Sequence, residues 1–258
     1  MRIRRIAIVG LGQIGGSLIL ALRKRKLSYH LTGIDPSRKR LRLLASYLDA
    51  SVASTQQFPY ADLVILCLHY KETIDYLLRA PRGKLLLDVC SAKQKIVKRA
   101  TGLGLRFIGG HPMAGNERAA EAGWDPDLFT GHPFFLCPTS RLQKTDLQSI
   151  RKLVSAIGAD PTVVDPAAHD RHLAATSHFP AFLSRAFAEL TTSTPEMYRG
   201  PGYHSMTRLA HTSPELLQTF LLANGDNVLV SAEKLQRALN RWIKKAGVQV
   251  KKTKRKQG

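Results

Sequence analysis

A glycine-rich segment near the N terminus constrains the fold of this chain more than any other feature. An apolar stretch from Ile6 to Val9 is followed by Gly10-Leu11-Gly12-Gln13-Ile14-Gly15, and a second apolar stretch continues to Leu22. A strand, a tight glycine turn and a helix in this order are typical of the first unit of a dinucleotide-binding fold. The alternative is a simple turn without a ligand.

Each part of this segment has a physical role in binding a dinucleotide. Gly10 permits the tight turn, Gly12 leaves room for the pyrophosphate, and Gly15 lets the helix pack closely on the strand. The first helical turn, with Gln13 and Ile14, offers unpaired N–H groups and a partial positive charge to the phosphates. These five residues are the predicted cofactor-binding positions of the glycine turn.

An acidic residue follows the second expected strand. Asp35 comes directly after the apolar run 31–34, where a carboxylate can accept hydrogen bonds from ribose hydroxyls and repel a 2′-phosphate. The sequence therefore favours NAD over NADP. The basic stretch 38–40 could instead hold that phosphate, although a solvated helix face is preferred. Because Pro36 suits a first helical position, Asp35 could also cap the following helix.

The first 165 residues alternate apolar runs with helical patterns. This alternation predicts an α/β fold with a Rossmann-type, mainly parallel sheet covered by helices on both faces. The expected helices cover residues 14–22 and 37 to about 46, and the expected strands cover residues 6–9, 31–34, 63–68, 85–89, 107–108, 134–136 and 162–164.

The pattern changes after Pro166 and becomes helical. We expect a dinucleotide-binding domain over 1–165, an all-helical substrate and dimerisation domain over 166–250, and a basic tail over 251–258. The longest helix is expected from Asn224 to Ala246. A helical domain of this size is too small to bury a large core alone, so a homodimer is the expected assembly.

Composition narrows the class of protein. The net charge is +20, which attracts anionic ligands and leaves nucleic-acid binding through the solvated tail as an alternative. The three cysteines form no C-x-x-C pair, so neither a disulfide framework nor a metal site is expected, and a cytoplasmic location is favoured. No apolar run is long enough to span a bilayer. The basic start of the chain imitates a secretory signal, but the glycine spacing favours the strand and helix.

Three later segments carry side chains suited to catalysis and binding. They are Asp88-Val89-Cys90-Ser91-Ala92-Lys93, then Gly109-Gly110-His111-Pro112-Met113-Ala114-Gly115-Asn116-Glu117, and a third group made of His169-Asp170, Ser177-His178-Phe179-Pro180 and residues 202–210. In this order after the glycine-rich unit, they resemble the prephenate dehydrogenase family. The H-P-M-A-G-x-E run is the most specific part, and the resemblance extends from Ile6 to about Asn227.

The resemblance implies NAD-dependent oxidative decarboxylation of prephenate, a small-molecule substrate of tyrosine biosynthesis. Hydride leaves C4 for the nicotinamide, the ring carboxylate leaves as CO2, and the ring becomes aromatic. His111 matches the catalytic base that accepts the C4 hydroxyl proton. Ser91 matches a serine near the same hydroxyl. Taken alone, His111 could be a loop histidine, and Ser91 with Gln94 has the spacing of a helix capping box.

Further residues match substrate positions of the family. Arg208 matches the arginine that holds a substrate carboxylate, a task that suits the planar guanidinium fork. Glu117 and Asp170 match acidic positions near the substrate entrance and the base, or are solvated carboxylates in a first helical turn. Ser177 lies seven residues after Asp170, and two α-helical turns would put both on one face. His204 is a candidate for the substrate arm.

The sequence departs from the family at the substrate arm. Ala181 stands where the family often has a second histidine, and His204-Ser205 replaces a usual basic–acidic pair. Leu68-His69-Tyr70 also replaces a strand end that normally carries proline. Arogenate and 4-amino-4-deoxyprephenate are therefore open alternatives to prephenate.

Two other classes of protein share parts of this pattern. A β-hydroxyacid or imine dehydrogenase would rely on a helix lysine, but no lysine lies between Val163 and Ala232. An NAD-sensing or nucleic-acid-binding module would use the basic tail, tolerate loss of His111 and bind polyanions with steep salt dependence.

Overall fold

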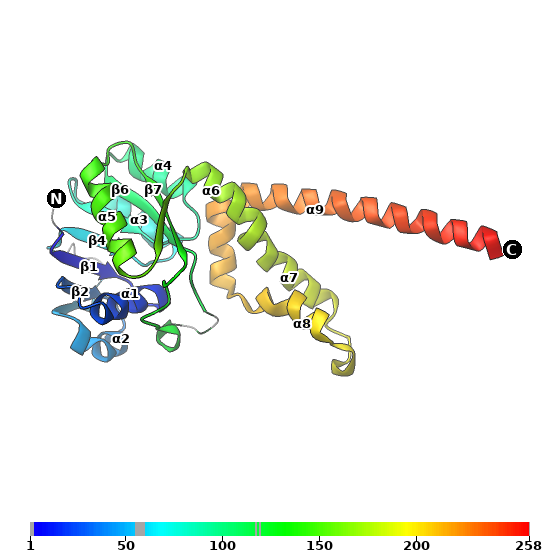
Figure 1. Cartoon of the computed structure of the whole chain (residues 1–258), viewed down its shortest axis with the longest axis horizontal. Helices are drawn as coiled ribbons and strands as arrows, with labels where there is room; N and C mark the ends of the chain where they lie inside the picture. The colour runs from blue at the N-terminus through cyan, green and yellow to red at the C-terminus, as the bar shows by residue number, and fades with distance from the viewer. Residues whose placement is uncertain (1–2, 55–59, 117, 119, 258) are drawn as a thin grey trace. The chain divides into compact units, whose positions relative to one another are not determined.

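The computed structural model describes the chain except residues 1–2, 55–59, 117, 119 and 258, and gives only the backbone of residues 248–257. The chain divides into two compact units, Met1–Asp170 and Arg171–Gly258 (Figure 1). Our sequence-based boundary at residue 165 lies just before helix α6 (Pro166–Leu173), whose first part belongs to the first unit.

An eight-stranded sheet forms the centre of the first unit, in the order β3-β2-β1-β4-β5-β6-β7-β8. Neighbouring strands are parallel except β6 and β7. The predicted α/β fold with a mainly parallel sheet is therefore confirmed. The strands are β1 (Arg5–Val9), β2 (His30–Ile34), β3 (Ala50–Val52), β4 (Leu63–Leu66), β5 (Leu85–Asp88), β6 (Arg106–Pro112), β7 (Pro133–Pro138) and β8 (Asp160–Val163).

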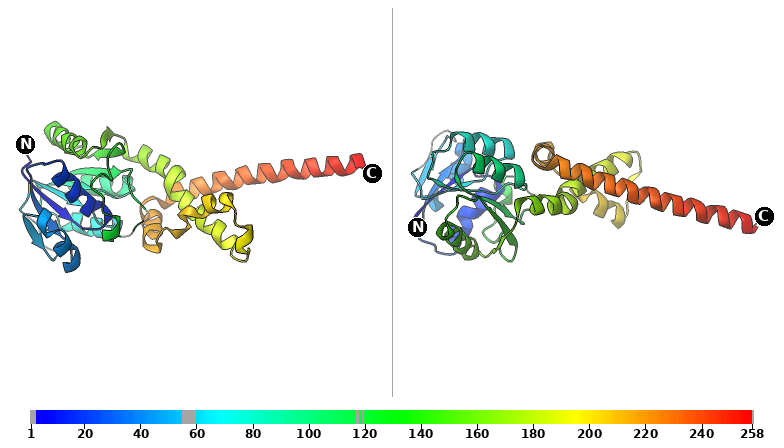
Figure 2. Two further views of the ribbon diagram at one scale, coloured as in Figure 1. Left: turned by 60° about the horizontal axis from the view of Figure 1, so that its bottom comes forward. Right: turned by 90° about the horizontal axis from the view of Figure 1, so that it is seen from above.

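Helices cover both faces of this sheet because side chains alternate along each strand. Ile6 and Ile8 of β1 pack in one core with α1 (Gln13–Lys24) and α5 (Lys144–Ala156). Ala7 and Val9 pack in a second core with α3 (Tyr70–Arg79) and α4 (Gln94–Gly102). Figure 2 shows helices on the two sides of the sheet. Burial on both faces explains why the strands are apolar without alternation.

Two strands differ from the sequence-based expectation. β3 was missed because it is only three residues long and two of them are exposed, so its pairing with β2 is what defines it. β6 was expected only over 107–108, yet it continues through Gly109, Gly110, His111 and Pro112. Glycine weakens strand propensity, but antiparallel pairing with β7, including Gly110 with Leu136, holds this part extended.

The second unit is helical. A π-helical turn, Ala174–His178, leads from α6 into α7 (Phe179–Leu190); then come α8 (Pro201–Thr207), the short helix η5 (Arg208–His211) and α9 (Pro214–Gln257). Ala181, Leu217 and Phe220 form its small buried core. In the part of the chain that the structure describes, no helix is long and apolar enough to cross a membrane.

The longest helix begins ten residues before the expected start. Asn224, the predicted first residue, has non-helical angles (φ −139, ψ 20), so it marks a break inside α9 instead. Its amide lies 3.0 Å from Nδ1 of His178, whose ring stacks on Phe220. The helical backbone continues to Gln257, so residues 251–257 of the basic tail extend α9.

Candidate active site

The glycine turn has the geometry that the sequence predicted. Gly10 has φ +89°, and a Cβ there would lie 2.3 Å from the carbonyl oxygen of Cys67. A Cβ on Gly15 would lie 1.9 Å from the carbonyl oxygen of Gly10, whereas one on Gly12 would meet no protein atom within 4 Å. Gly12 is the N-cap of α1, and no side chain caps this helix. The turn therefore combines a constrained backbone with an uncapped helix N terminus beside open space at Gly12.

Asp35 ties this turn to the end of β2. Its buried carboxylate accepts hydrogen bonds from the backbone N–H of Leu11 and of Ser37, each 2.7 Å long. The alternative of Asp35 as a helix cap is wrong, because Ser37 is the N-cap of α2 (Arg38–Leu43) and accepts from the N–H of Arg40. Strand order reverses between β1 and β4, and such a switch point is where open α/β sheets bind ligands.

The loop after β6 packs over the glycine turn. The Gln13 side-chain amide donates to Oδ1 of Asn116 (2.6 Å) and to the carbonyl of Arg118 (2.7 Å), and Trp124 Nε1 donates to the carbonyl of Gly12 (2.9 Å). Gln13 was predicted at the cofactor through its helical turn, and its side chain is engaged with protein. Ile14 packs against the core. Sequence reasoning missed Asn116 and Trp124, because their partners lie about a hundred positions away.

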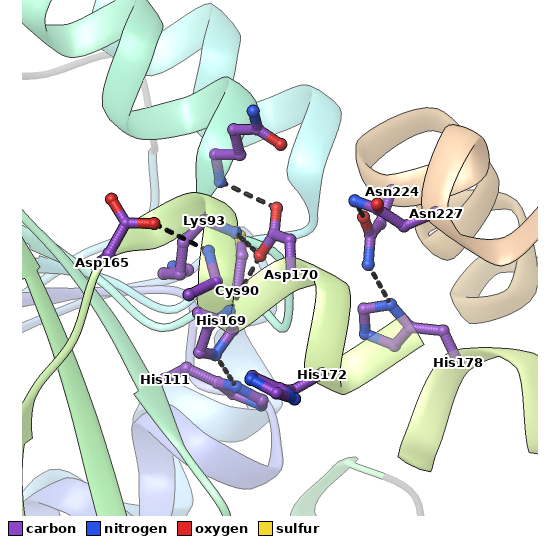
Figure 3. A network of polar contacts seen from close by, with 12 residues as sticks. Cys90, Lys93, His111, Asp165, His169, Asp170, His172, His178, Asn224 and Asn227 are labelled. Carbon is purple, nitrogen blue, oxygen red and sulfur yellow. Dashed lines mark hydrogen bonds and ion pairs between the residues drawn. The ribbon is translucent and has the colours of Figure 1, made fainter. Parts of the chain in front are cut away.

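A chain of three polar side chains lies at the carboxyl end of β6 (Figure 3). Nδ1 of His111 is 3.0 Å from Nε2 of His169, and Nδ1 of His169 is 2.8 Å from Oδ1 of Asp170. The His169 ring also meets Phe135 of β7 edge to face, with centroids 5.3 Å apart. His111 is partly exposed, while His169 and Asp170 are buried. His111 lies in a strand, so the loop-histidine alternative is wrong.

Asp170 caps helix α4 from a distant part of the sequence. Its carboxylate accepts hydrogen bonds from the backbone N–H of Lys93 (2.7 Å) and of Gln94 (2.8 Å). These bonds satisfy N–H groups of the helix start, where a negative charge is stabilised. The capping-box alternative for Ser91 is therefore wrong: α4 begins at Gln94, and no side-chain bond comes from its N-cap, Lys93. Asp170 is fully buried, and through His169 it lies near the proposed base, while its expected role in substrate binding stays a prediction.

A buried ion pair fixes the backbone next to His111. Lys93 Nζ lies 2.5 Å from Asp88 Oδ2 and 2.6 Å from the carbonyl of Gly110, and both side chains are fully buried. Asp88 also accepts from the N–H of Gly110 and of Cys90. These contacts join the carboxyl ends of β5 and β6. The signal for this pair in the sequence is two opposite charges, Asp88 and Lys93, within a mostly apolar stretch.

The remaining predicted site residues lie in both units of the chain. Ser91 lies in the turn after β5, the parallel neighbour of the strand that carries His111. Glu117 lies outside the described residues. In the second unit, Ser177 is partly buried, and His204 and Arg208 are exposed. The seven-residue spacing of Asp170 and Ser177 does not span two α-helical turns, because the π-helical turn intervenes. Among the described residues, no group of three His, Cys, Asp or Glu could hold a metal ion.

The first unit is a doubly wound sheet with a glycine turn at its switch point and a histidine at the same edge. These features, followed by a helical second unit, define the class as a Rossmann-type dinucleotide-binding protein. Residues 18–163 match the family model for the prephenate dehydrogenase nucleotide-binding domain, and residues 165–252 match the model for its dimerization domain. The chain therefore belongs to the prephenate dehydrogenase family, which confirms the resemblance. The first match begins just after the glycine turn.

Individual relatives are moderately similar. Prephenate dehydrogenase of Bacillus subtilis is 28% identical over 244 residues, covering 87% of this chain and 65% of the relative. The chain thus spans about two thirds of the length of that relative. The crystal structure of Aquifex aeolicus prephenate dehydrogenase with hydroxyphenyl propionate and NAD+ has a TM-score of 0.85 and 25% identity, covering 96% of this chain and 93% of that one. Synechocystis arogenate dehydrogenase has a TM-score of 0.78 and 25% identity, covering 95% and 92%.

Proposed function

We propose that this protein is an NAD-dependent oxidoreductase that converts prephenate to 4-hydroxyphenylpyruvate by oxidative decarboxylation, in tyrosine biosynthesis. The observation that carries the proposal is the His111–His169–Asp170 chain at the sheet edge that also bears the glycine turn. Family membership and the Aquifex structure solved with NAD+ and a hydroxyphenyl ligand support it.

The residues of the first unit fit a bound NAD. The N terminus of α1 lacks a side-chain cap, so its N–H groups and partial positive charge suit a pyrophosphate. A Cβ at Gly12 would meet no protein atom within 4 Å, so internal packing does not require glycine here, and the open space suits an approaching pyrophosphate. Asp35 lies beside the turn with a carboxylate suited to ribose hydroxyls. NAD, when bound, supplies the hydride acceptor.

In this proposal, the hydrogen-bond chain favours Nε2 of His111 as the base. The Asp170 carboxylate is an acceptor, so Nδ1 of His169 donates to it and Nε2 of His169 must accept. Nδ1 of His111 then donates to Nε2 of His169, which leaves Nε2 of His111 as the acceptor nitrogen. In the proposed reaction this nitrogen takes the C4 hydroxyl proton, and the Asp170 charge stabilises the resulting imidazolium through His169.

The identity of the arm on the substrate ring is the open part of this proposal. Prephenate carries a keto-acid arm and arogenate an amino-acid arm, whereas 4-amino-4-deoxyprephenate differs at C4. We retain Arg208 as the proposed carboxylate-binding residue, with Ser177, His204 and Glu117 as further substrate residues and Ser91 beside the reacting hydroxyl. These roles come from the sequence resemblance.

One assay tests the function directly. The purified chain is mixed with NAD and either prephenate or arogenate, and NADH formation is followed by absorbance. Parallel reactions contain NADP in place of NAD. We expect turnover with NAD and prephenate. In the His111→Asn variant, kcat should fall by roughly 10² to 10⁴ while NAD still binds. Absence of turnover with every substrate would refute the proposed reaction. Normal turnover in the His111→Asn variant would remove His111 from the mechanism.

We further propose a homodimer in the reducing cytoplasm. The match of residues 165–252 to a dimerization domain supports the dimer, as do apolar side chains on α9 such as Leu239, Trp242 and Ile243, which are 51%, 68% and 68% exposed. The three cysteines are free thiols, in keeping with a reducing location. Sedimentation of the purified chain should give twice the monomer mass. A monomer at micromolar concentration would contradict the dimer.

The excess positive charge is assigned to attraction of the anionic substrate and cofactor. Truncation after Val250 removes the whole basic tail. It distinguishes attraction of small anionic ligands from nucleic-acid binding through the tail. Unchanged turnover in the truncated chain would leave the tail as an accessory, whereas salt-sensitive polyanion binding lost with the tail would favour the alternative.

A further inference from the structure

Glu121 bridges two cationic side chains of helix α2. Its Oε1 lies 2.6 Å from Nζ of Lys39, and its Oε2 lies 3.2 Å from Nε of Arg40. Glu121 belongs to the short helix η2 (Ala120–Gly123), which contacts α1 and lies beside it in Figure 1. Because these residues are more than eighty positions apart, the pairing arises only from the fold.

The location gives this ion pair a consequence for cofactor choice. Lys39 and Arg40 follow Asp35, the residue proposed to bind the ribose hydroxyls, by four and five positions. Basic residues just beyond this acidic position are where a Rossmann domain accommodates a 2′-phosphate. One guanidinium nitrogen of Arg40 also lies 3.5 Å from Asp35, so this side chain contacts two carboxylates.

We propose that Glu121 is a cofactor-selectivity residue, whose carboxylate occupies the two cations that would otherwise bind a 2′-phosphate, so that NADP is excluded. Residues 38–40 form a basic stretch in the sequence, and in the structure Glu121 pairs with two of its three cations. A 2′-phosphate would have to displace one carboxylate and approach a second. The inference rests on the proposed dinucleotide site and adds to it a residue outside the glycine turn and β2.

Two further observations support a fixed position for Glu121. Trp124 is bonded to the Gly12 carbonyl, and Gln13 is bonded to Asn116, so the loop is attached to α1 on both sides of η2. The hydrogen bonds from Lys39, from its own backbone N–H and from Arg40 lower the pKa of Glu121 to about 2. The carboxylate is therefore charged at every pH at which the protein would work.

A partly exposed ion pair can also exist without any function. Direct binding titrations with NAD and NADP, in the absence of substrate, distinguish the two cases. In Glu121→Gln, we expect NADP affinity to rise by about tenfold, since two cations become available to the phosphate, while NAD affinity stays within about twofold. The gain should shrink with added salt, because exposed charges are screened.

Matched variants make the test specific. Asp127→Asn removes a nearby acid that pairs with Lys24 at the other end of α1, and it should leave both affinities unchanged. Lys39→Ala should have little effect alone but should reduce the NADP gain in the Glu121→Gln background. If Glu121→Gln leaves NADP affinity unchanged, or tightens both dinucleotides equally, the inference is wrong. Tight NAD binding without turnover would refute only the proposed reaction, whereas binding of neither dinucleotide by the unmodified chain would overturn both.

Discussion

Nδ1 of His111 lies 3.0 Å from Nε2 of His169, and this contact connects a partly exposed imidazole to a buried carboxylate. It makes His169 a positioning residue for the proposed base. Without it, the His111 ring could take the other tautomer or turn away from the productive orientation. The pair therefore offers the most direct test of how the site works.

Replacing His169 by Gln should lower kcat by roughly 10- to 100-fold, less than the loss expected on replacing the base itself. KM and NAD affinity should change little, because His169 is buried and contacts neither the substrate nor NAD in the proposed arrangement. The acidic limb of the pH–rate profile should also move, which a purely structural role would not cause. Parallel loss of NAD affinity and kcat would indicate general damage and contradict the positioning role.

Replacing Lys93 by Met should destabilise the first unit by about 3–5 kcal/mol, because Asp88 would remain as a buried charge without its cation. Urea unfolding followed by circular dichroism measures this. Lys98→Met is a matched control inside helix α4, which Lys93 precedes: its side chain is exposed, and the change should stay within about 0.5 kcal/mol. Equal effects of the two substitutions would contradict the importance of the buried pair.

Cys90 and Cys137 should resist alkylation in the folded protein. Burial, with a smaller contribution from the nearby Asp88 carboxylate, raises the pKa of each thiol to about 12, so neither forms thiolate at neutral pH. Iodoacetamide treatment with and without urea, followed by peptide mass spectrometry, should show labelling of these two residues only after unfolding. Rapid labelling under native conditions would mean that this region opens readily.

The Glu121 ion pairs should contribute to stability in a pH-dependent manner. The folded-state pKa of Glu121, about 2, lies below the usual 4.5, so its contribution is complete above about pH 5 and is lost as the pH falls toward 2. The difference in Tm between the unmodified chain and Glu121→Gln should therefore narrow between pH 5 and pH 2. A difference that is constant or grows in acid would contradict the lowered pKa.

Arg208 tests the part of the site taken from the sequence resemblance. Its side chain is exposed in η5, so Arg208→Ala should alter stability little. If it holds a substrate carboxylate, KM for prephenate should rise by roughly tenfold or more, since a charge-assisted pair is lost, while NAD affinity is unchanged. Equal effects on substrate and nucleotide would place Arg208 elsewhere in the mechanism.

Several elements of the site could not be predicted from local patterns. The capping-box spacing of Ser91 and Gln94 was a reasonable signal, but Asp170 satisfies the N terminus of α4 instead. Likewise, the low strand propensity of Gly109 and Gly110 disfavours a strand, and only the pairing with β7 extends β6 through them. In both cases a partner distant in sequence overrides a weak local preference.

What the sequence by itself determined is the α/β fold, the glycine turn and the order of the chemistry-bearing segments. Such features depend on residues a few positions apart, through strand and helix periodicity and the conformational freedom of glycine. Only the tertiary structure decided that His111 meets His169, that Asp170 is buried, and that Glu121 pairs with Lys39 and Arg40. Those contacts join positions tens of residues apart, because sheet order and loop packing bring them together and no local pattern encodes them.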